Sequence, residues 1–435
     1  MNRRDFLKTT GLTLTSLAAG WAAAQDTSPD AVLGDADSRI NRHRKARAIL
    51  KLTSPDGRAL PPDTPVLIEQ TGHKFLFGCN IFKLNRCRTA ADNAAYAERF
   101  AALLNFATLP FYWWNYERER GKPDDARSDE IIQWCKAHAV TTKGHPLAWN
   151  YVQPPWLGDD TTEAMTLQMA RIERCTRRFA GGIDIWDVVN EAVHYDRPFC
   201  KEQAPTLTKA IAEIGIGAYV RRAFAAARTG NPAATLLIND YRTDPAYADT
   251  VISELTADGK PMYDVIGIQS HMHGGCWGPE QTWRVCEQHA RFGVPLHFTE
   301  TTVVSGAKSG DRWPSTPDGE QAQAKAVAEF YTVLFSHPAV HAITWWDFTD
   351  QGSWQAAPAG LVRDDMTPKP AYDRLMDLVK RKWWTRLDAA VGPQGRADLD
   401  GFLGQYKATA KLPGRTLTGT FTLDKSLETI NVSLA

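Results

Sequence analysis

A short apolar segment in the middle of the chain ends in two polar residues. Residues 186–191 read Trp-Asp-Val-Val-Asn-Glu, so Asn190 and Glu191 come directly after a run typical of a strand that is buried on both faces. A carboxylate at the end of such a strand is costly unless it is solvated, paired or used in chemistry. A second glutamate, Glu300, follows another apolar run, residues 296–299. These two carboxylates are the candidate reactive groups.

Paired carboxylates can cleave a glycosidic bond. One glutamate, protonated, gives its proton to the leaving oxygen, while the other, ionised, attacks the anomeric carbon. The apolar neighbours of Glu191 favour the protonated form and the acid/base role. Glu300 lies beside Thr299 and, as we expect, near Gln269 and His271, whose donors would keep it ionised. Tryptophan rings stack on the C–H faces of sugars, which makes the 15 tryptophans of this chain candidates for a sugar site.

The elements that would position these groups are eight short apolar strands separated by helical segments. The predicted strands are residues 75–79, 106–111, 140–145, 183–190, 235–240, 265–271, 296–299 and 342–346. Strands that alternate with helices over about 300 residues predict an α/β fold, a (β/α)8 TIM barrel. A doubly wound open sheet is the alternative, but no glycine-rich phosphate loop follows any strand.

The polar residues of these strands gather at one end. In a TIM barrel the site lies at the carboxyl ends of the strands. Those ends carry the two candidate catalytic residues and a set of candidate substrate-binding residues. The catalytic candidates are Glu191 and Glu300, and the substrate-binding candidates are Trp113, His145, Trp149, Asn190, Gln269, His271, Trp346 and Trp354.

Several of these segments resemble motifs of the family-10 glycoside hydrolases, the retaining β-1,4-xylanase family, over about residues 70 to 380. Residues 186–191 resemble the acid/base motif, and residues 293–300 (Gly-Val-Pro-Leu-His-Phe-Thr-Glu) resemble the nucleophile motif. Residues 144–149 (Gly-His-Pro-Leu-Ala-Trp) and 268–271 (Ile-Gln-Ser-His) match two further segments. The resemblance implies that Glu191 is the acid/base, Glu300 the nucleophile, and Asn190 the amide that binds the 2-hydroxyl group of the cleaved sugar.

The chain departs from the family pattern at several positions, among them those that read the neighbouring, −2 sugar. Thr108, Leu109, Phe111 and Tyr112 replace the usual polar residues and lysine, Asn150 replaces a histidine, and Thr301 and Thr302 follow the nucleophile position in place of Leu-Asp. The resemblance thus implies a retaining endo-β-1,4-glycosidase acting on xylan or a xylan-like polysaccharide. Two alternatives stay open: the same mechanism on a different β-glycan, and a non-catalytic carbohydrate-binding barrel.

The ends of the chain lie outside the barrel pattern. Residues 1–24 combine Arg3-Arg4, an apolar run and three alanines, which predicts a twin-arginine signal peptide and export to the periplasm or the exterior. Residues 25–72 and 385–435 contain alternating strands, and we expect them to form one small β appendage beside a catalytic barrel of residues 73–384.

Charge and cysteine content narrow the partners. With 50 acidic and 50 basic residues, the chain offers no electrostatic reason to bind nucleic acid or, after signal removal, a membrane. The seven cysteines and the histidines lack metal-ligand spacing, so neither a metal nor a cofactor is expected. The predicted partner is a polysaccharide substrate, and the predicted state is a monomer.

Overall fold

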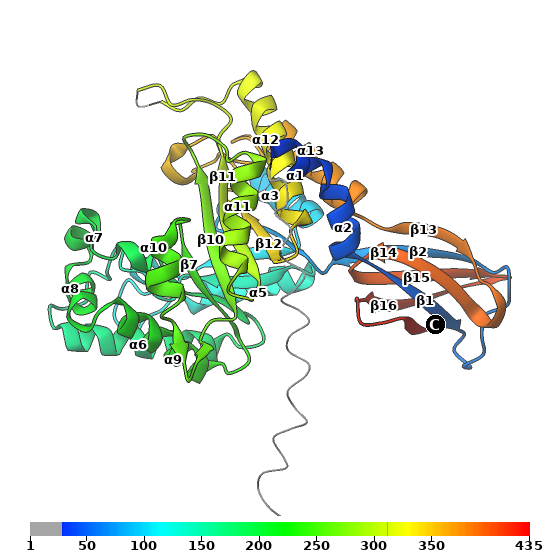
Figure 1. Cartoon of the computed structure of the whole chain (residues 1–435), viewed down its shortest axis with the longest axis horizontal. Helices are drawn as coiled ribbons and strands as arrows, with labels where there is room; N and C mark the ends of the chain where they lie inside the picture. Colours follow the sequence, from blue (N-terminus) through cyan, green and yellow to red (C-terminus); the bar gives the residue numbers. More distant parts are fainter. Residues whose placement is uncertain (1–27, 311) are drawn as a thin grey trace, which may run out of the picture.

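The computed structural model describes residues 28–310 and 312–435. Two parts are visible in Figure 1: a barrel surrounded by helices and, beside it, a smaller body made only of strands, which carries the C-terminus. Within the described residues, no helix has the length and apolar character needed to cross a membrane. The predicted signal peptide, residues 1–24, lies outside the described residues.

Eight parallel strands close into a barrel, which confirms the predicted TIM-barrel fold. In order around the barrel they are β3 (Leu76–Asn80), β4 (Phe106–Pro110), β5 (Thr141–His145), β6 (Ile185–Asn190), β7 (Thr235–Asp240), β10 (Val265–Met272), β11 (Leu296–Val303) and β12 (Val340–Trp345). All eight correspond to predicted strands. The largest difference is in β11, which continues to Val303 and so includes Glu300 instead of ending before it.

Helices cover the outside of the barrel and follow the strands in turn. The longer ones are α3 (Ala90–Leu103), α5 (Asp125–Ala137), α6 (Thr161–Arg178), α8 (Pro205–Ile214), α9 (Ile216–Gly230), α11 (Pro279–Ala290), α12 (Pro317–Ser336) and α13 (Pro370–Asp377). Shorter elements lie in the connections: α4 (Trp113–Tyr116), α7 (Pro198–Gln203), α10 (Pro245–Tyr247), β8 (Thr256–Ala257) and β9 (Lys260–Pro261). Their apolar faces pack on the strands in one continuous core.

Close packing inside this core depends on a glycine next to a predicted site residue. A Cβ atom on Gly144 of β5 would lie 2.1 Å from the ring of Trp186 on β6. Because only glycine leaves this space, the large indole can lie flat against the neighbouring strand. The residue that follows, His145, is thereby held at the carboxyl end of the barrel.

Irregularities in strand pairing occur at the two strands that carry the glutamates. Between β10 and β11, Ile268 pairs with Phe298 and Gln269 with Glu300, so that Thr299 is an extra residue. The pairing of β6 with β7 is shifted in the same way before Asn190. Bulges of this kind change the direction of the side chains that follow them and are frequent next to active sites.

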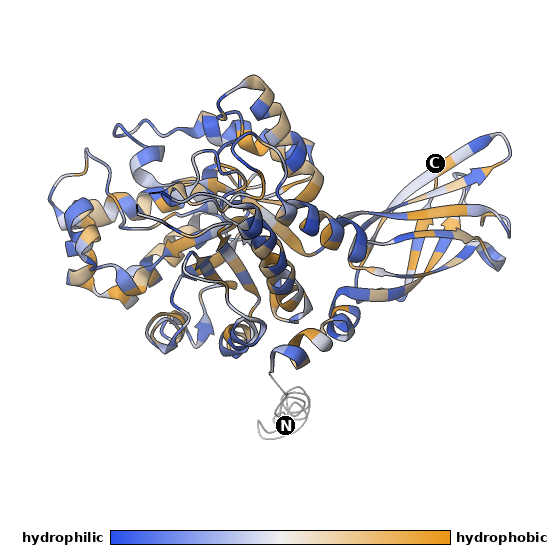
Figure 2. Cartoon of the chain, turned by 90° about the horizontal axis from the view of Figure 1, so that it is seen from above, coloured by the Kyte–Doolittle hydropathy of each residue, from blue (hydrophilic) through white to orange (hydrophobic). Residues whose placement is uncertain are grey.

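The β appendage consists of two sheets that combine strands from both ends of the chain. One sheet has the order β14-β1-β17 and the other the order β13-β2-β15-β16. The strands are β1 (Lys45–Thr53), β2 (Pro65–His73), β13 (Arg386–Ala390), β14 (Arg396–Phe402), β15 (Gly404–Leu412), β16 (Arg415–Leu423) and β17 (Thr429–Ser433). A separate hydrophobic core lies between the sheets, and Figure 2 shows hydrophobic and hydrophilic stretches interspersed along these strands.

The appendage confirms the predicted association of the two termini, but the segment before it differs from the expectation. Residues 28–44, expected to belong to the β segment, form the helices α1 (Pro29–Gly34) and α2 (Ala36–Arg44). These helices contact α11 and α12 of the barrel. Val32 packs there with Trp283 and Val333, which gives the helices an apolar reason to lie on the barrel.

Candidate active site

A cleft of about 640 Å³ opens at the carboxyl ends of the barrel strands. Most of the predicted site residues lie in it. Its wall includes His145, Trp149, Glu191, Gln269, His271, Glu300, Trp346 and Trp354. The structure therefore brings together eight of the ten predicted residues, from five strands and the segments that follow them. Asn190 is buried beside them, and only Trp113 lies elsewhere.

Glu300 lies at the bottom of the cleft and is 5% exposed. Its Oε1 accepts a hydrogen bond from Asn239 Nδ2 at 2.9 Å, and its Oε2 lies 3.1 Å from His271 Nε2. His145 Nε2 is 3.8 Å from Oε1. Burial raises the pKa of the Glu300 carboxyl, but the charge of His145 and the contact with His271 outweigh burial and bring the pKa below its ordinary value. These contacts favour the ionised carboxylate that a nucleophile needs.

The orientation of His271 follows from its other ring nitrogen. His271 Nδ1 lies 2.8 Å from Thr302 Oγ1, and this hydroxyl donates its hydrogen to the carbonyl of Trp346 at 2.9 Å. Because the Thr302 hydrogen is already used, Nδ1 must be the donor in the contact with Thr302. His271 Nε2 then faces Glu300 Oε2 at 3.1 Å.

A second layer of charge lies below His145. Asp187 Oδ2 is 2.7 Å from His145 Nδ1 and 2.6 Å from Lys143 Nζ, and the three side chains are buried. Burial raises the pKa of the Asp187 carboxyl, but the contacts with Lys143 and His145 lower it by more, so this pKa lies below its ordinary value. The carboxylate fixes the orientation of His145 and counters the charge of Lys143, which also acts on Glu300.

Glu191 differs from Glu300 in its backbone and in its partners. It has a left-handed backbone conformation, with φ of 55°, which is unusual for a residue other than glycine and often marks functional positions. Gln269 Nε2 donates to Oε1 at 3.1 Å, and the Arg197 guanidinium donates to Oε2. The apolar surroundings expected for Glu191 are therefore replaced by an amide on one oxygen and a cation on the other.

A chain of amides joins the two glutamates. Asn239 Nδ2 donates to Glu300 Oε1 and also lies 2.8 Å from Asn190 Oδ1. The same Asn190 oxygen accepts from Gln269 Nε2 at 3.1 Å, and Gln269 contacts Glu191. Thr299 Oγ1 donates to Asn239 Oδ1 at 2.6 Å, which fixes the amide orientation. Since every link is buried, the two carboxylates are held in one fixed arrangement.

Aromatic rings form one wall of the cleft. The rings of Trp149 and Tyr151 are stacked with centroids 4.3 Å apart, and Tyr112 and Trp114 pack against Trp149. Within the described residues, the buried Nε1 of Trp149 has no hydrogen-bond partner. Trp149 can stack its indole face on a ring that carries hydroxyl groups and donate a hydrogen bond from Nε1 to one of these hydroxyls.

The opposite wall is formed by the segment after β12. Trp346 packs edge-on against His145. Trp354 is 44% exposed, and the centroid of its ring lies 4.6 Å from that of the His271 ring. Asp347 accepts a hydrogen bond from Trp354 N at 2.6 Å and another from Asn80 Nδ2 at 2.7 Å. This pair of bonds fixes the exposed indole relative to the barrel.

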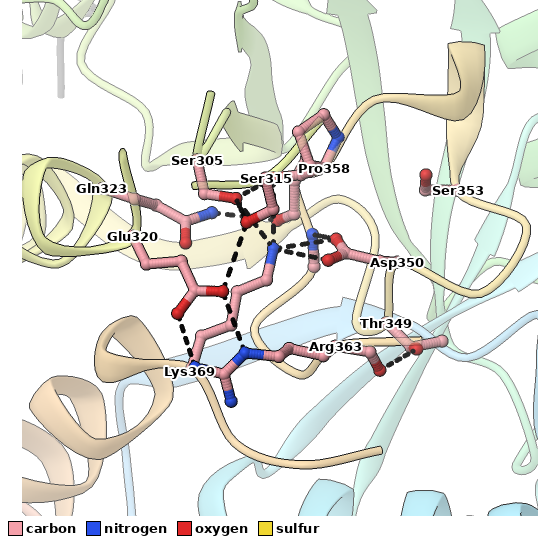
Figure 3. A network of polar contacts seen from close by, with 12 residues as sticks. Ser305, Ser315, Glu320, Gln323, Thr349, Asp350, Ser353, Pro358, Arg363 and Lys369 are labelled. Atoms are coloured by element: carbon pink, nitrogen blue, oxygen red, sulfur yellow. Dashed lines mark hydrogen bonds and ion pairs between the residues drawn. The ribbon is translucent and has the colours of Figure 1, made fainter. Parts of the chain in front are cut away.

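A buried ionic network supports the same segment from behind. Lys369 Nζ lies 2.7 Å from Asp350, 3.0 Å from Ser305 Oγ and 3.2 Å from the carbonyl oxygen of Pro358. Figure 3 draws this network with the residues around it. Arg363 binds Glu320 beside it. Asp350 accordingly orients its neighbours and does not line the cleft.

The predicted substrate-binding role of Trp113 does not agree with its position. Trp113 is 5% exposed, packs edge-on against Trp156, and donates from Nε1 to Glu117 Oε2 at 2.9 Å. It begins the short helix α4, whose first turn points its ring away from the cleft and brings the next residue, Trp114, into it. Trp113 and Trp114 are adjacent after the strand, and the sequence does not show which of the two indoles faces the cleft.

Some functional residues were not among the predictions. Lys143 lies two residues before His145 and shares its strand face, so the two-residue period of a strand would have indicated it. Asp187 stands within the acid/base motif itself, and Asn239 is the last residue but one of the fifth barrel strand, β7. Arg197 lies in the connection after β6, where the sequence contains no signal that would place it beside Glu191. No group of three or more His, Cys, Asp or Glu side chains within the described residues could hold a metal ion.

A TIM barrel with two buried glutamates in one aromatic cleft, at the carboxyl ends of its strands, defines a glycoside hydrolase. The chain belongs to glycosyl hydrolase family 10, whose family model matches residues 72–378. This finding confirms the resemblance that the motifs indicated.

Individual relatives agree with this assignment. Endo-1,4-beta-xylanase 3 of Hypocrea jecorina is 29% identical over 279 residues, which cover 62% of this chain and 73% of that protein. The anti-sigma-I factor RsgI6 of Acetivibrio thermocellus is 25% identical over 393 residues, and the match spans 88% of this chain but only 47% of that protein. The crystal structure of xylanase 10B from Thermotoga maritima has a TM-score of 0.60 at 26% identity and covers 71% of this chain and 96% of its own.

Proposed function

We propose that this protein is a retaining endo-β-1,4-glycosidase that hydrolyses xylan or a xylan-like polysaccharide by double displacement. One observation carries the proposal: the two buried glutamates belong to one amide network but differ in their other partners. Glu300 is held by an amide and two histidines, and Glu191 is held by an amide on one oxygen and by Arg197, which lines the cleft, on the other. The relatives named as xylanases support the choice of substrate.

In the first step, Glu300 attacks the anomeric carbon while the bond to the leaving sugar breaks. Glu191 gives its proton to the leaving oxygen, so the leaving sugar departs as a neutral alcohol. His145 and His271 keep the attacking carboxylate oriented and ionised until its oxygen forms the covalent bond. The buried pair of Lys143 and Asp187 fixes the imidazole of His145 in this position.

In the second step, Glu191 acts as a base. It takes a proton from water, and the water oxygen attacks the anomeric carbon and displaces Glu300. Glu300 returns to its ionised state, and Glu191 is again protonated. The two inversions at the same carbon give a product with the anomeric configuration of the substrate.

The experiment that tests this function is NMR of the anomeric configuration during hydrolysis of a panel of β-glycans that includes xylan. We expect β-configured product to form first and then to equilibrate. An inverted product would contradict double displacement, and cleavage of another β-glycan without cleavage of xylan would contradict the substrate. Binding to glycans without turnover would support a non-catalytic carbohydrate-binding barrel instead.

The distance between the carboxyl groups of Glu191 and Glu300 provides a second test. Retaining enzymes hold their two carboxyl groups about 5–5.5 Å apart, and inverting enzymes leave a wider gap for water. A crystal structure of the protein would measure this separation directly. A separation of about 9 Å would contradict the retaining mechanism.

Export is part of the same proposal. A polysaccharide is too large to enter the cell intact, so its hydrolase has to meet it outside the cytoplasm. The twin-arginine pattern of residues 1–24 provides the route. Mass spectrometry of the protein from periplasmic and culture fractions is expected to find a chain that begins near Gln25. Replacing both arginines, Arg3→Lys and Arg4→Lys, is expected to keep the protein in the cytoplasm.

A further inference from the structure

The part of the cleft beyond Glu191 is cationic and aromatic. Arg197 lies over the ring of Tyr151 at 5.5 Å, and both residues line the cleft. Tyr241, 37% exposed, stacks on His194 at 5.2 Å, and His194 contacts Arg242 at 2.8 Å. A sugar ring bound here would lie among aromatic side chains and next to a guanidinium.

Arg197 differs from the other arginines near the site in what its guanidinium binds. Arg171 is buried and donates to two backbone carbonyls, and Arg242 is paired with Asp244. Arg197 contacts Glu191 Oε2 and, through Nε, Cys200 Sγ at 3.2 Å. Within the described residues its Nη1 has no hydrogen-bond partner, and its side chain is 27% exposed. The guanidinium thus presents a free donor to the cleft.

The contact between Arg197 and Glu191 conflicts with the acid step. Gln269 donates to Oε1 of Glu191, so the proton that the acid delivers belongs on Oε2. Arg197 donates to the same Oε2, and a guanidinium stays charged and has no acceptor. The hydroxyl oxygen of a carboxylic acid can still accept a hydrogen bond, but the guanidinium and the proton compete for the lone pairs of the same oxygen. An anion that takes the guanidinium from Oε2 therefore assists the acid step.

We propose that the cleft takes a β-glycan whose leaving-group unit carries a carboxylate, and that this carboxylate binds Arg197 in place of Glu191. The proposal rests on the function proposed above and specifies its substrate class. Guanidinium and carboxylate match in a two-bond geometry, and Nη1 supplies the second donor. Glu191, released from Arg197, takes one proton from a solvent hydronium ion, which becomes water, and passes this proton to the leaving oxygen. Arg197 then makes the acid step depend on the charge of the substrate.

The test uses substrate pairs that differ only in the carboxylate. One pair is a xylan with glucuronic acid side groups and the same xylan after reduction of its carboxyl groups to alcohols. A second pair is a β-1,4-linked polymer of glucuronic acid and its reduced form, which distinguishes a carboxylate in the backbone from one on a side group. We expect wild-type kcat/KM to be at least tenfold higher for the acidic member of at least one pair, at constant ionic strength.

Two variants locate the effect. In Arg197→Gln we expect the acidic-to-reduced ratio of kcat/KM to fall below threefold. Arg291→Gln is the matched control, because Arg291 also pairs with a carboxylate, Asp249, but on the outside of the barrel. We expect it to keep the wild-type ratio. The wild-type ratio needs no variant, so the proposal can be tested even where Arg197→Gln does not fold.

The outcomes are distinguishable from failure of the proposed function. Equal wild-type rates on both members of both pairs, or a ratio that Arg197→Gln leaves unchanged, overturn the role of Arg197 and leave the glycosidase assignment intact. Arg197 would then be a positioning residue that only orients Glu191. Absence of turnover on every glycan, neutral or acidic, overturns the proposed function and this inference with it.

Discussion

The two ends of the barrel each open into a cavity, and the larger one is not the candidate active site. The cleft at the carboxyl ends has a volume of about 640 Å³, whereas a cavity at the amino ends, which we call the base cavity, has about 720 Å³. The base cavity lies between the barrel and the appendage. Its lining includes His43, Arg44, His73, Lys74, His297, His341 and Asp424.

Burial has different consequences for Glu300 in the cleft and for two histidines of the base cavity. In the cleft, donors from several strands lower the pKa of Glu300 despite its burial and favour its charged form. In the base cavity, burial lowers the pKa of His297 to about 3 and that of His43 to about 4, which removes their charge at neutral pH. Preorganised charge, and not volume, therefore distinguishes the reactive end of the barrel.

Replacing Glu300, the proposed nucleophile, is the strongest test of this contrast. In Glu300→Gln we expect kcat/KM on the polysaccharide to fall by about 10⁴-fold or more, because the amide cannot form the covalent intermediate. The matched control is Asp424→Asn, a carboxylate in the base cavity, which we expect to keep kcat/KM within about twofold since a surface change leaves the distant cleft intact. Comparable losses in both variants would contradict the contrast.

Replacement of Glu191, the proposed acid/base residue, is expected to have a smaller and substrate-dependent effect. In Glu191→Gln we expect kcat/KM on the polysaccharide to fall by about 10²- to 10⁴-fold. On a 2,4-dinitrophenyl glycoside the loss in the first step should nearly vanish, because that leaving group departs without a proton. Stopped-flow measurement of phenolate release separates the two steps. An equal loss on both substrates would argue against proton donation by Glu191.

The buried charges under the cleft connect activity to stability. In Asp187→Asn, Lys143 and His145 lose their buried partner, and we expect a loss of about 3–5 kcal/mol in the free energy of unfolding together with lower kcat/KM. Because the pKa of Asp187 is lowered by folding, its stabilisation is present above the ordinary carboxyl pKa and disappears as the pH falls through the folded-state value. Urea unfolding of both proteins between neutral and acidic pH measures this, and the difference between them should shrink in acid.

The contrast between the two ends of the barrel was only partly predictable from the sequence. The eight strands and most cleft residues were predictable, because residues at the strand ends, such as Asn190 and His271, stand in recognisable motifs. In a TIM barrel these ends all lie on one face. The connections were less predictable. Trp113 and Trp114 are adjacent, and only the turn of α4 decides which of them enters the cleft.

The conformation of connections and the contacts between distant segments formed the part that sequence could not supply. Arg197 follows Glu191 by only six residues, and no recognisable motif in that short connection encodes their contact. The base cavity is likewise made of residues from both termini and from the amino ends of seven strands. Helices α1 and α2 lie within the predicted β segment, in a polar stretch for which no strand was predicted, and they pack on α11 and α12 of the barrel.

A pair of tryptophan replacements sharpens the distinction between cleft and core. In Trp149→Phe the cleft loses an N–H donor that has no partner among the described residues, and we expect KM to rise about threefold to tenfold, since one hydrogen bond is worth roughly 0.5–1.5 kcal/mol. In Trp113→Phe the indole loses its bond to Glu117, and we expect lower stability with unchanged KM. Steady-state kinetics and thermal melts of both variants decide the matter, and a KM effect of Trp113→Phe would place it back in the site.

The smallest expected effect on activity lies in the base cavity. His297 is buried there, its Nδ1 has no hydrogen-bond partner among the described residues, and its pKa is lowered from 6.5 to about 3. Between these pH values His297 is protonated in the unfolded chain but not in the folded chain. The free energy of unfolding therefore decreases as the pH falls through this range. In His297→Leu we expect a flatter dependence of unfolding free energy on pH and unchanged kcat/KM, whereas the exposed His138→Gln should keep the wild-type slope. A loss of activity in His297→Leu would mean that the two ends of the barrel are coupled, and the base cavity would then belong to the functional machinery.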